Sequence, residues 1–167
     1  MLNITERITL AEKVDADQID DSLELPFDLR QKSRLRVTLK SGLEAALMLD
    51  RGTILRGGDL LRAEDGTVVK IIAAEQPVHD VVADTQQALM CAAYHLGNRH
   101  VPLQVGDGWL RLEQDHVLKE MLLGLGMKVT EKNAPFEPEA GAYGGGHRHS
   151  HDDGPSIRPP LRVLRHA

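Results

Sequence analysis

The stretch "TQQALMCAAYHLGNRHVPLQV", residues 85–105, decides how the second half of this chain folds. Apolar residues recur at helical spacing through "ALMCAAYHL", and Asp84 and Thr85 can cap the start of that helix. Gly97 and Asn98 then form a stop signal, because both residue types tolerate the backbone that ends a helix. The apolar run "VPLQV" after the stop is typical of a strand.

The same alternation of strands and helices extends outward from this stretch. "VHDVVA" before it predicts a strand, and "VPLQV" with "GWLRLE" predicts a hairpin around Gly106 to Gly108. Asp115 can cap a helix over "HVLKEMLLGLG", and "MKVTEK" predicts a last strand. The helix is expected to bury five apolar side chains: Val117, Leu118, Met121, Leu122 and Leu125. The resulting order, βαββαβ, indicates a ferredoxin-like α/β sandwich.

The first half of the chain is predicted to be all β. Period-2 alternation flanks Ser41-Gly42 and again Asp65-Gly66, which are hairpin signals. A short turn near Phe27 to Lys32 is the one expected interruption. From Ala134 onward Pro, Gly and charged residues dominate, so we expect a disordered tail.

We therefore predict an α+β protein in three parts. Residues 1–74 form an N-terminal β domain, residues 75–136 a ferredoxin-like domain, and residues 137–167 a flexible tail that contains histidine.

Composition narrows the possible functions of the 167 residues. A net charge of −5 argues against nucleic-acid binding, and the candidate central strands lack the aromatic residues of RNA-recognition modules. The chain has no apolar run of about 20 residues and no signal-peptide pattern, so we expect a cytoplasmic protein without membrane contact. The single Cys91 fits a reducing compartment, and we expect it to be buried in its helix. No phosphate loop or nucleophile elbow is present, so an enzyme is not expected.

Three of the eight histidines lie in "GGGHRHSHDD" as His147, His149 and His151. In an extended backbone their side chains point the same way, and neutral imidazole is a common ligand of nickel, copper, zinc and iron. Such a tail binds metal weakly alone, because ordering it costs conformational entropy. A ligand on the folded body is therefore expected, unless the tail histidines are incidental.

The folded part of the chain offers three further candidate metal ligands, and each of them also has a purely structural interpretation. His100 lies just past the helix stop and is either a ligand or an ordinary loop histidine. His95 lies in the last helical turn, where a cation also suits the helix dipole. His116 follows the capping residue of the second helix, so a role at the helix start is the simpler interpretation. His79, in a strand, is interpreted as incidental.

Several segments, taken in order, resemble the UreE family, the nickel metallochaperones of urease maturation. They are "RQKSRLRVTL", "RGTILRGGDLL", "EDGTVVKI", "YHLGNRHVPLQV", "DHVLKEMLLGLGMKV" and "APFEPEAGAYGGGH". The resemblance implies an N-terminal β domain that contacts protein partners and a homodimer formed by the ferredoxin-like domain. It also implies that His100 is the central nickel ligand and that two copies of it meet across the dimer axis.

By the same resemblance, tail histidines add ligands, which maps by analogy onto His147, His149 and His151. Some members have a His-x-His pair where this chain reads "QDH", so an auxiliary site at His116 is expected to be weakened. His95 belongs to the motif but is not the shared ligand.

The implied function is Ni(II) delivery to apo-urease together with the urease maturation GTPase. Imidazole also accepts Zn(II), Cu(II) and Co(II). Two alternatives remain: a nickel or zinc buffer, and a metal-responsive interaction module.

Overall fold

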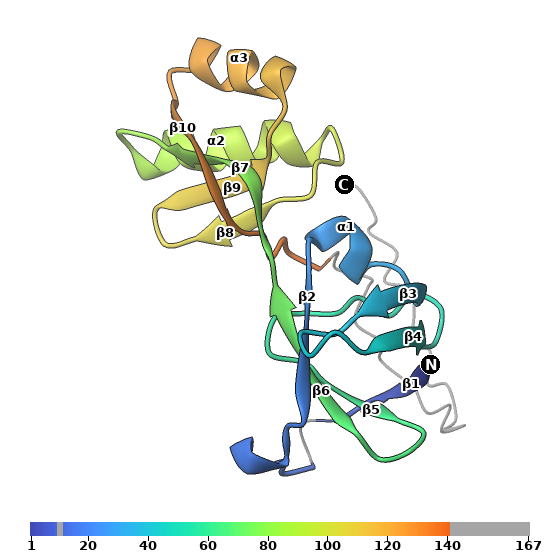
Figure 1. Cartoon of the computed structure of the whole chain (residues 1–167). Helices are drawn as coiled ribbons and strands as arrows, with labels where there is room; N and C mark the ends of the chain where they lie inside the picture. The colour runs from blue at the N-terminus through green and yellow to red at the C-terminus, as the bar shows by residue number, and fades with distance from the viewer. Residues whose placement is uncertain (10–11, 141–167) are drawn as a thin grey trace, which may run out of the picture.

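The computed structural model describes residues 1–9 and 12–140 of the chain. It confirms the α+β class, with one sheet in each half of the molecule (Figure 1). The first half contains β1 (Leu2–Arg7), a 3-10 turn (Ala16–Gln18), β2 (Asp21–Leu25), α1 (Phe27–Arg30), β3 (Arg34–Thr38), β4 (Glu44–Met48), β5 (Leu60–Ala63) and β6 (Val68–Ala73). The second half contains β7 (Glu75–Val82), α2 (Gln86–Gly97), β8 (Gln104–Gly106), β9 (Trp109–Glu113), α3 (His116–Gly124) and β10 (Lys128–Pro135). None of the helices in these ranges is long and apolar enough to cross a membrane.

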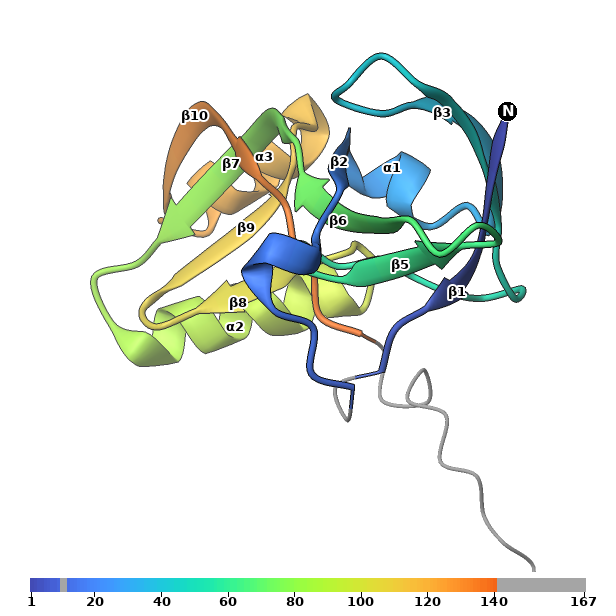
Figure 2. The ribbon, with the colours of Figure 1, turned by 60° about the horizontal axis from the view of Figure 1, so that its bottom comes forward.

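The six strands of the first half form one sheet in the order β2-β6-β5-β1-β4-β3. The two predicted hairpins, β3–β4 and β5–β6, are confirmed as antiparallel pairs, and β5 and β6 lie side by side in Figure 2. The amide of Lys40 donates to the carbonyl of Ser22, which draws the end of β3 back towards β2. Apolar side chains from all six strands fill the interior between these edges, among them Ile4, Leu47 and Ile71.

The four strands of the second half form an antiparallel sheet in the order β10-β7-β9-β8. This is the strand order of a ferredoxin-like fold, as the βαββαβ pattern predicted. Both helices contribute to one core with the sheet, through Leu89 and Leu96 of α2 and Leu122 of α3. The predicted caps are present: the side chain of Thr85 accepts from the amide of Ala88, and that of Asp115 accepts from the amide of Leu118.

Three local expectations for this domain are wrong. Val117 and Leu125 of the α3 segment are 59% and 42% exposed, because the sheet can cover only one stripe of a nine-residue helix. Cys91 is exposed, next to the buried Ala92, so it lies on the outer side of α2. The strand expected from Val101 begins only at Gln104.

The chain also stays ordered past Ala134, where a disordered tail was expected to begin. β10 continues to Pro135, and the next side chain, Phe136, is fully buried between the two halves of the molecule. Its ring meets that of Phe27 in α1 edge to face, with 5.4 Å between centroids. Beside this pair, the buried Arg30 donates to the carbonyls of Leu25, Leu55 and Phe136, and its guanidinium lies 2.5 Å from the Glu137 carboxylate. The junction therefore fixes the point at which the chain leaves the fold.

A glycine in β8 makes room for the tryptophan opposite it in β9. A Cβ on Gly106 would overlap the Trp109 ring, and the Arg111 guanidinium lies 5.0 Å from the centroid of that ring. We expect Gly106→Ala to lower the free energy of unfolding by about 1–3 kcal/mol, because the ring must leave its place. Chemical denaturation followed by tryptophan fluorescence measures this. Gly124→Ala is the control, since a Cβ there meets no atom within 4 Å, and an equal loss in both variants would contradict the packing explanation.

An ion pair on the four-stranded sheet makes the stability of the fold depend on pH. Arg111 donates to both oxygens of Asp80, at 2.6 and 3.0 Å, and these bonds hold the pKa of Asp80 below its ordinary value although burial opposes them. A lowered pKa stabilises the fold at neutral pH, and that stabilisation is lost as the pH falls below about 4. We expect Asp80→Asn to cost about 1.5–3 kcal/mol at pH 7 and much less at pH 3. Urea titrations at both pH values measure it.

The matched control is Asp84→Asn, which removes an exposed carboxylate paired with Lys128. Exposed pairs contribute little, so this variant should change stability by less than about 1 kcal/mol. An Asp80→Asn penalty that is the same at pH 3 and pH 7 would show that the ion pair is not its cause.

Candidate functional site

His100 lies at the turn between α2 and β8, in an unusual backbone conformation. Its φ is +55°, and among the residues that the structure describes it is the one non-glycine with a positive φ. Its amide donates to the carbonyl of Gly97 at 2.9 Å, and the next amide, of Val101, donates to Leu96 at 3.3 Å. A left-handed backbone is uncommon for residues other than glycine, although histidine adopts it more readily than most, and such residues cluster at functional sites. The imidazole is exposed at the end of a rigid helix.

The surface beside His100 is hollowed, with a volume of about 330 Å³. Its wall includes Glu113, the last residue of β9, and Gln114 and Asp115 from the connection between β9 and α3. All three side chains are already used by the fold: Asp115 caps α3, the Gln114 amide group donates to the carbonyl of Val78 at 3.3 Å, and the Glu113 carboxylate accepts from the Gln76 amide group at 2.8 Å. The hollow therefore places two carboxylates in the same wall as one imidazole, and hydrogen bonds hold both carboxylates in place.

His79 takes part in holding that wall. It is 2% exposed, and its Nε2 accepts a hydrogen bond from the amide of Asp115 at 3.1 Å. Because Nε2 accepts, the ring proton lies on Nδ1, which has no hydrogen-bond partner among residues 1–9 and 12–140. His79 thus has a structural role, which its interpretation as incidental to metal binding did not include. Its alternation with Val81 on one face of a strand was the signal that could have shown its burial.

The remaining candidate histidines do not gather around His100. His95 lies in the last turn of α2 with its ring against that of Tyr94, 5.7 Å between centroids, and His116 is the exposed first residue of α3. Within residues 1–9 and 12–140, no three His, Cys, Asp or Glu side chains are close enough to hold a metal ion together. The predicted ligands His147, His149 and His151 lie outside the described residues. A metal at His100 would thus need ligands from beyond this part of the chain.

The last described residues run beside the His100 segment. The amide of Glu139 donates to the carbonyl of Leu103 at 2.8 Å, three residues after His100, and the amide of Glu137 donates to the Gln104 side chain at 2.9 Å. From Glu139 to His147 is eight residues, which span at most about 29 Å when extended. That length is enough for His147 to reach His100.

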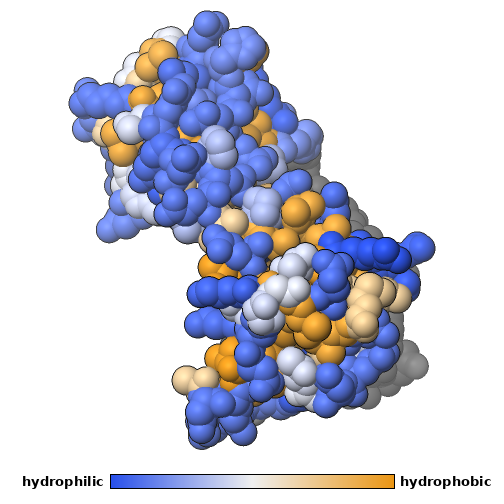
Figure 3. All heavy atoms as spheres, in the orientation of Figure 1, coloured by the Kyte–Doolittle hydropathy of each residue, from blue (hydrophilic) through white to orange (hydrophobic). Residues whose placement is uncertain are grey.

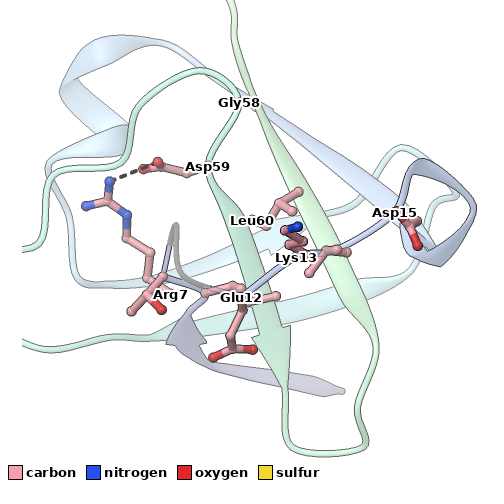
Figure 4. A pocket seen from close by; sticks show the side chains of 10 residues that line it. Arg7, Glu12, Lys13, Asp15, Gly58, Asp59 and Leu60 are labelled. Carbon is pink, nitrogen blue, oxygen red and sulfur yellow. Dashed lines mark hydrogen bonds and ion pairs between the residues drawn. The ribbon is translucent and has the colours of Figure 1, made fainter.

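A larger hollow, of about 760 Å³, lies in the first half of the molecule (Figure 4). No histidine lines it. Among its charged side chains, Arg7 pairs with Asp59 at 2.9 Å and Glu12 with Arg62 at 2.5 Å, whereas Lys13 and Asp15 make no ion pair with the described residues. Its carboxylates belong to no group of three ligands within the described residues, so it is not a candidate metal site. The face shown in Figure 3 carries apolar residues at its surface mainly over this N-terminal half, whereas the ferredoxin-like half is mostly hydrophilic there.

Comparison with known proteins agrees with this architecture. Residues 3–74 match the family model described as "UreE urease accessory protein, N-terminal domain", and residues 76–158 match its C-terminal counterpart. A urease accessory protein UreE from Alkalilimnicola ehrlichii is 56% identical over 145 residues, 87% of this chain and 86% of the relative. The chain belongs to the UreE family of urease accessory proteins. Two other UreE proteins, from Ralstonia nicotianae and Cupriavidus necator, are 61% and 60% identical over 130 residues, 78% of this chain in each case.

The matched segment spans 62% of the length of the Ralstonia UreE and 68% of that of the Cupriavidus UreE. The 130-residue matches account for less of the relatives than of this chain, whereas the Alkalilimnicola UreE matches almost from end to end. The family resemblance found in the sequence motifs is thus confirmed across both halves of the UreE fold.

Proposed function

We propose that this UreE chain is a cytoplasmic nickel carrier that delivers Ni(II) for assembly of the urease active site. In this proposal residues 1–74 contact protein partners, residues 75–136 bind metal and dimerise, and residues 137–167 supply mobile ligands. Nickel is bound between the His100 imidazoles of two chains, and His147, His149 and His151 complete the shell. The protein is a carrier and not an enzyme.

The observation that carries the proposal is the position of His100. Its imidazole is exposed on a left-handed turn, and the described residues give it no complete set of ligands. Such a group binds an ion firmly only when a second copy or another segment adds nitrogen ligands. The path of Glu137 to Glu139 beside Leu103 supports a contribution from the tail.

A surface for the second copy lies on the same helix. Met90 and Tyr94 are 59% and 67% exposed and one helical turn apart, and their stripe leads towards the His100 turn. Exposed apolar side chains of this size favour a protein contact. A symmetric contact repeats each residue across the twofold axis, so an axis at the His100 end of this stripe would bring the two His100 side chains together.

Binding by mobile tail ligands also explains how nickel would be released. A tail imidazole can be exchanged for a ligand of a recipient without unfolding the domains, and tethering keeps the tail ligands at about millimolar local concentration. The recipients are the urease maturation GTPase and the urease apoprotein complex. The chain has no nucleotide loop, so any GTP hydrolysis belongs to the recipient.

Truncation before Gly144 tests the contribution of the tail. We expect the shortened chain to keep the His100 site but to bind fewer nickel ions per dimer and to bind them more weakly, by about tenfold or more. Calorimetric titration with Ni(II) measures both quantities. The control is the full chain with His166→Ala, which changes a tail histidine outside the cluster. Unchanged stoichiometry and affinity after truncation would contradict the proposed role of the tail.

A test of nickel delivery to apo-urease distinguishes a nickel carrier from a nickel or zinc buffer. We expect the nickel-loaded protein, mixed with the apo-urease complex and the GTPase, to restore more urease activity than the same amount of nickel held by a small chelator of equal affinity. Equal activation by both would favour the buffer.

A further inference from the structure

The outer face of β3 and β4 carries cations that the fold does not use. Alternation along β3 turns Val37 into the core and leaves Arg34 and Arg36 exposed on the other side. The register places Met48 opposite Arg34. Lys32 and Lys40 extend the row of exposed cations at either end of β3. We call these five exposed residues, Lys32, Arg34, Arg36, Lys40 and Met48, the β3 face; β3 and β4 lie together at one border of the sheet (Figure 1).

The cations of the β3 face form no ion pairs in the described part of the chain, although Lys40 lies near enough to Asp21 to add to the Ser41 hydrogen bond in lowering the pKa of that carboxyl. No Asp or Glu occurs from residue 31 to residue 43, and none of the four cations makes an ion pair with a residue in 1–9 or 12–140. The carboxylate of Glu44, at the end of β4, accepts a hydrogen bond from Thr38 at 3.1 Å. In a chain with a net charge of −5, this row of like charges is a local exception.

The face also has an apolar component. Met48 is 43% exposed between the cations of β3 and the rest of the sheet, and Leu43, at the turn before β4, is 50% exposed. Arginine and methionine are enriched in protein–protein interfaces relative to the rest of a surface. The planar guanidinium matches a carboxylate with two parallel hydrogen bonds, and a flexible methionine adapts to different apolar neighbours.

We propose that the β3 face is a docking surface for an acidic segment of a partner protein, with an apolar side chain of that segment packed on Met48. Charge complementarity selects this occupant, because carboxylates on the segment would pair with Arg34 and Arg36. A nucleic acid fits less well, since the net negative charge of the chain repels an extended polyanion. The proposal goes beyond nickel transfer, because no metal ligand takes part in it.

The test uses the full chain without metal and a fluorescein-labelled synthetic peptide of sequence EELEELEE. We expect fluorescence anisotropy to show binding at about 50 mM salt that weakens strongly at about 500 mM. The double variant Arg34→Glu with Arg36→Glu should bind the peptide at least tenfold more weakly. Met48→Ser should weaken it by about threefold, and this loss should be absent with the peptide EESEESEE, which lacks the apolar residues.

The matched control reverses two exposed cations elsewhere in the same half of the chain, Lys13→Glu with Lys70→Glu. It changes the net charge equally, so it should keep peptide affinity within about twofold of the unaltered chain if the effect is local. Equal losses in the two double variants, or no peptide binding by the unaltered chain, would overturn the proposal. So would tighter binding of a single-stranded oligothymidylate than of the peptide.

Three further measurements help to interpret the peptide-binding result. Arg34→Gln with Arg36→Gln gives intermediate affinity if charge is the cause, and circular dichroism melting shows whether each variant is folded. Nickel titration of the charge-reversed variant should give unchanged binding. The docking proposal and the nickel proposal can therefore be rejected independently of each other.

Discussion

Replacing His100 with alanine is expected to weaken tight Ni(II) binding by at least about 100-fold. The substitution removes two ligands from each dimer at once, if the site joins both chains. It should also relieve backbone strain little or not at all, since alanine is no better suited than histidine to a φ of +55°. Calorimetric titration of the full chain measures the loss, and thermal unfolding of the metal-free protein shows whether the fold is unchanged.

His95→Ala is the matched control for this experiment. His95 lies five residues before His100, in the last turn of α2, and its ring contacts Tyr94. We expect less than about a fivefold change in nickel affinity, because His95 is not the shared ligand. If both variants bind nickel as tightly as the unaltered chain, His100 has no part in the tight site.

Substitution of Arg30 by alanine should have the largest effect on stability. The guanidinium is fully buried and donates to three carbonyl groups, and burial lowers its pKa although the Glu137 carboxylate opposes that shift. Without it, the buried carbonyls of Leu55 and Phe136 lose the donor that Arg30 supplies, and the Glu137 carboxylate loses its nearest cation. We expect a loss of about 3–5 kcal/mol in the free energy of unfolding, measured by urea denaturation.

Two other arginine variants make the Arg30 result specific. Arg30→Lys keeps the charge but has no planar fork, so it should recover only part of the stability. Arg51→Ala changes an exposed arginine and should be within about 0.5 kcal/mol of the unaltered chain. An Arg30→Ala penalty below about 1 kcal/mol would show that the junction does not depend on this residue.

The parts of the fold that were predicted from sequence are those encoded by near neighbours. Thr85 and Asp115 bond to amides three residues along the chain, and the hairpin at Asp65-Gly66 needs only its own turn. The packing of Phe136 was missed because its partner, Phe27, is more than one hundred residues away. No local pattern reports such a contact.

In the candidate site, too, features set by neighbouring residues were predicted and features set by tertiary contacts were not. The motif around "GNRH" pointed to His100, but its left-handed φ and the support of the hollow by His79 depend on the tertiary structure. The exposure of Cys91 could not be predicted either, because alanines on both faces of α2 hide which side meets the core. The assignment of tail histidines as ligands stays a prediction.

The most direct test of the account is a crystal structure of the nickel-loaded dimer with anomalous scattering recorded at the nickel edge. We predict one nickel peak on the twofold axis, bonded to the imidazole of His100 from each chain, with at least one further imidazole from residues 147–151. A nickel peak away from His100, or His100 side chains that stay unbonded in the loaded protein, would contradict the account.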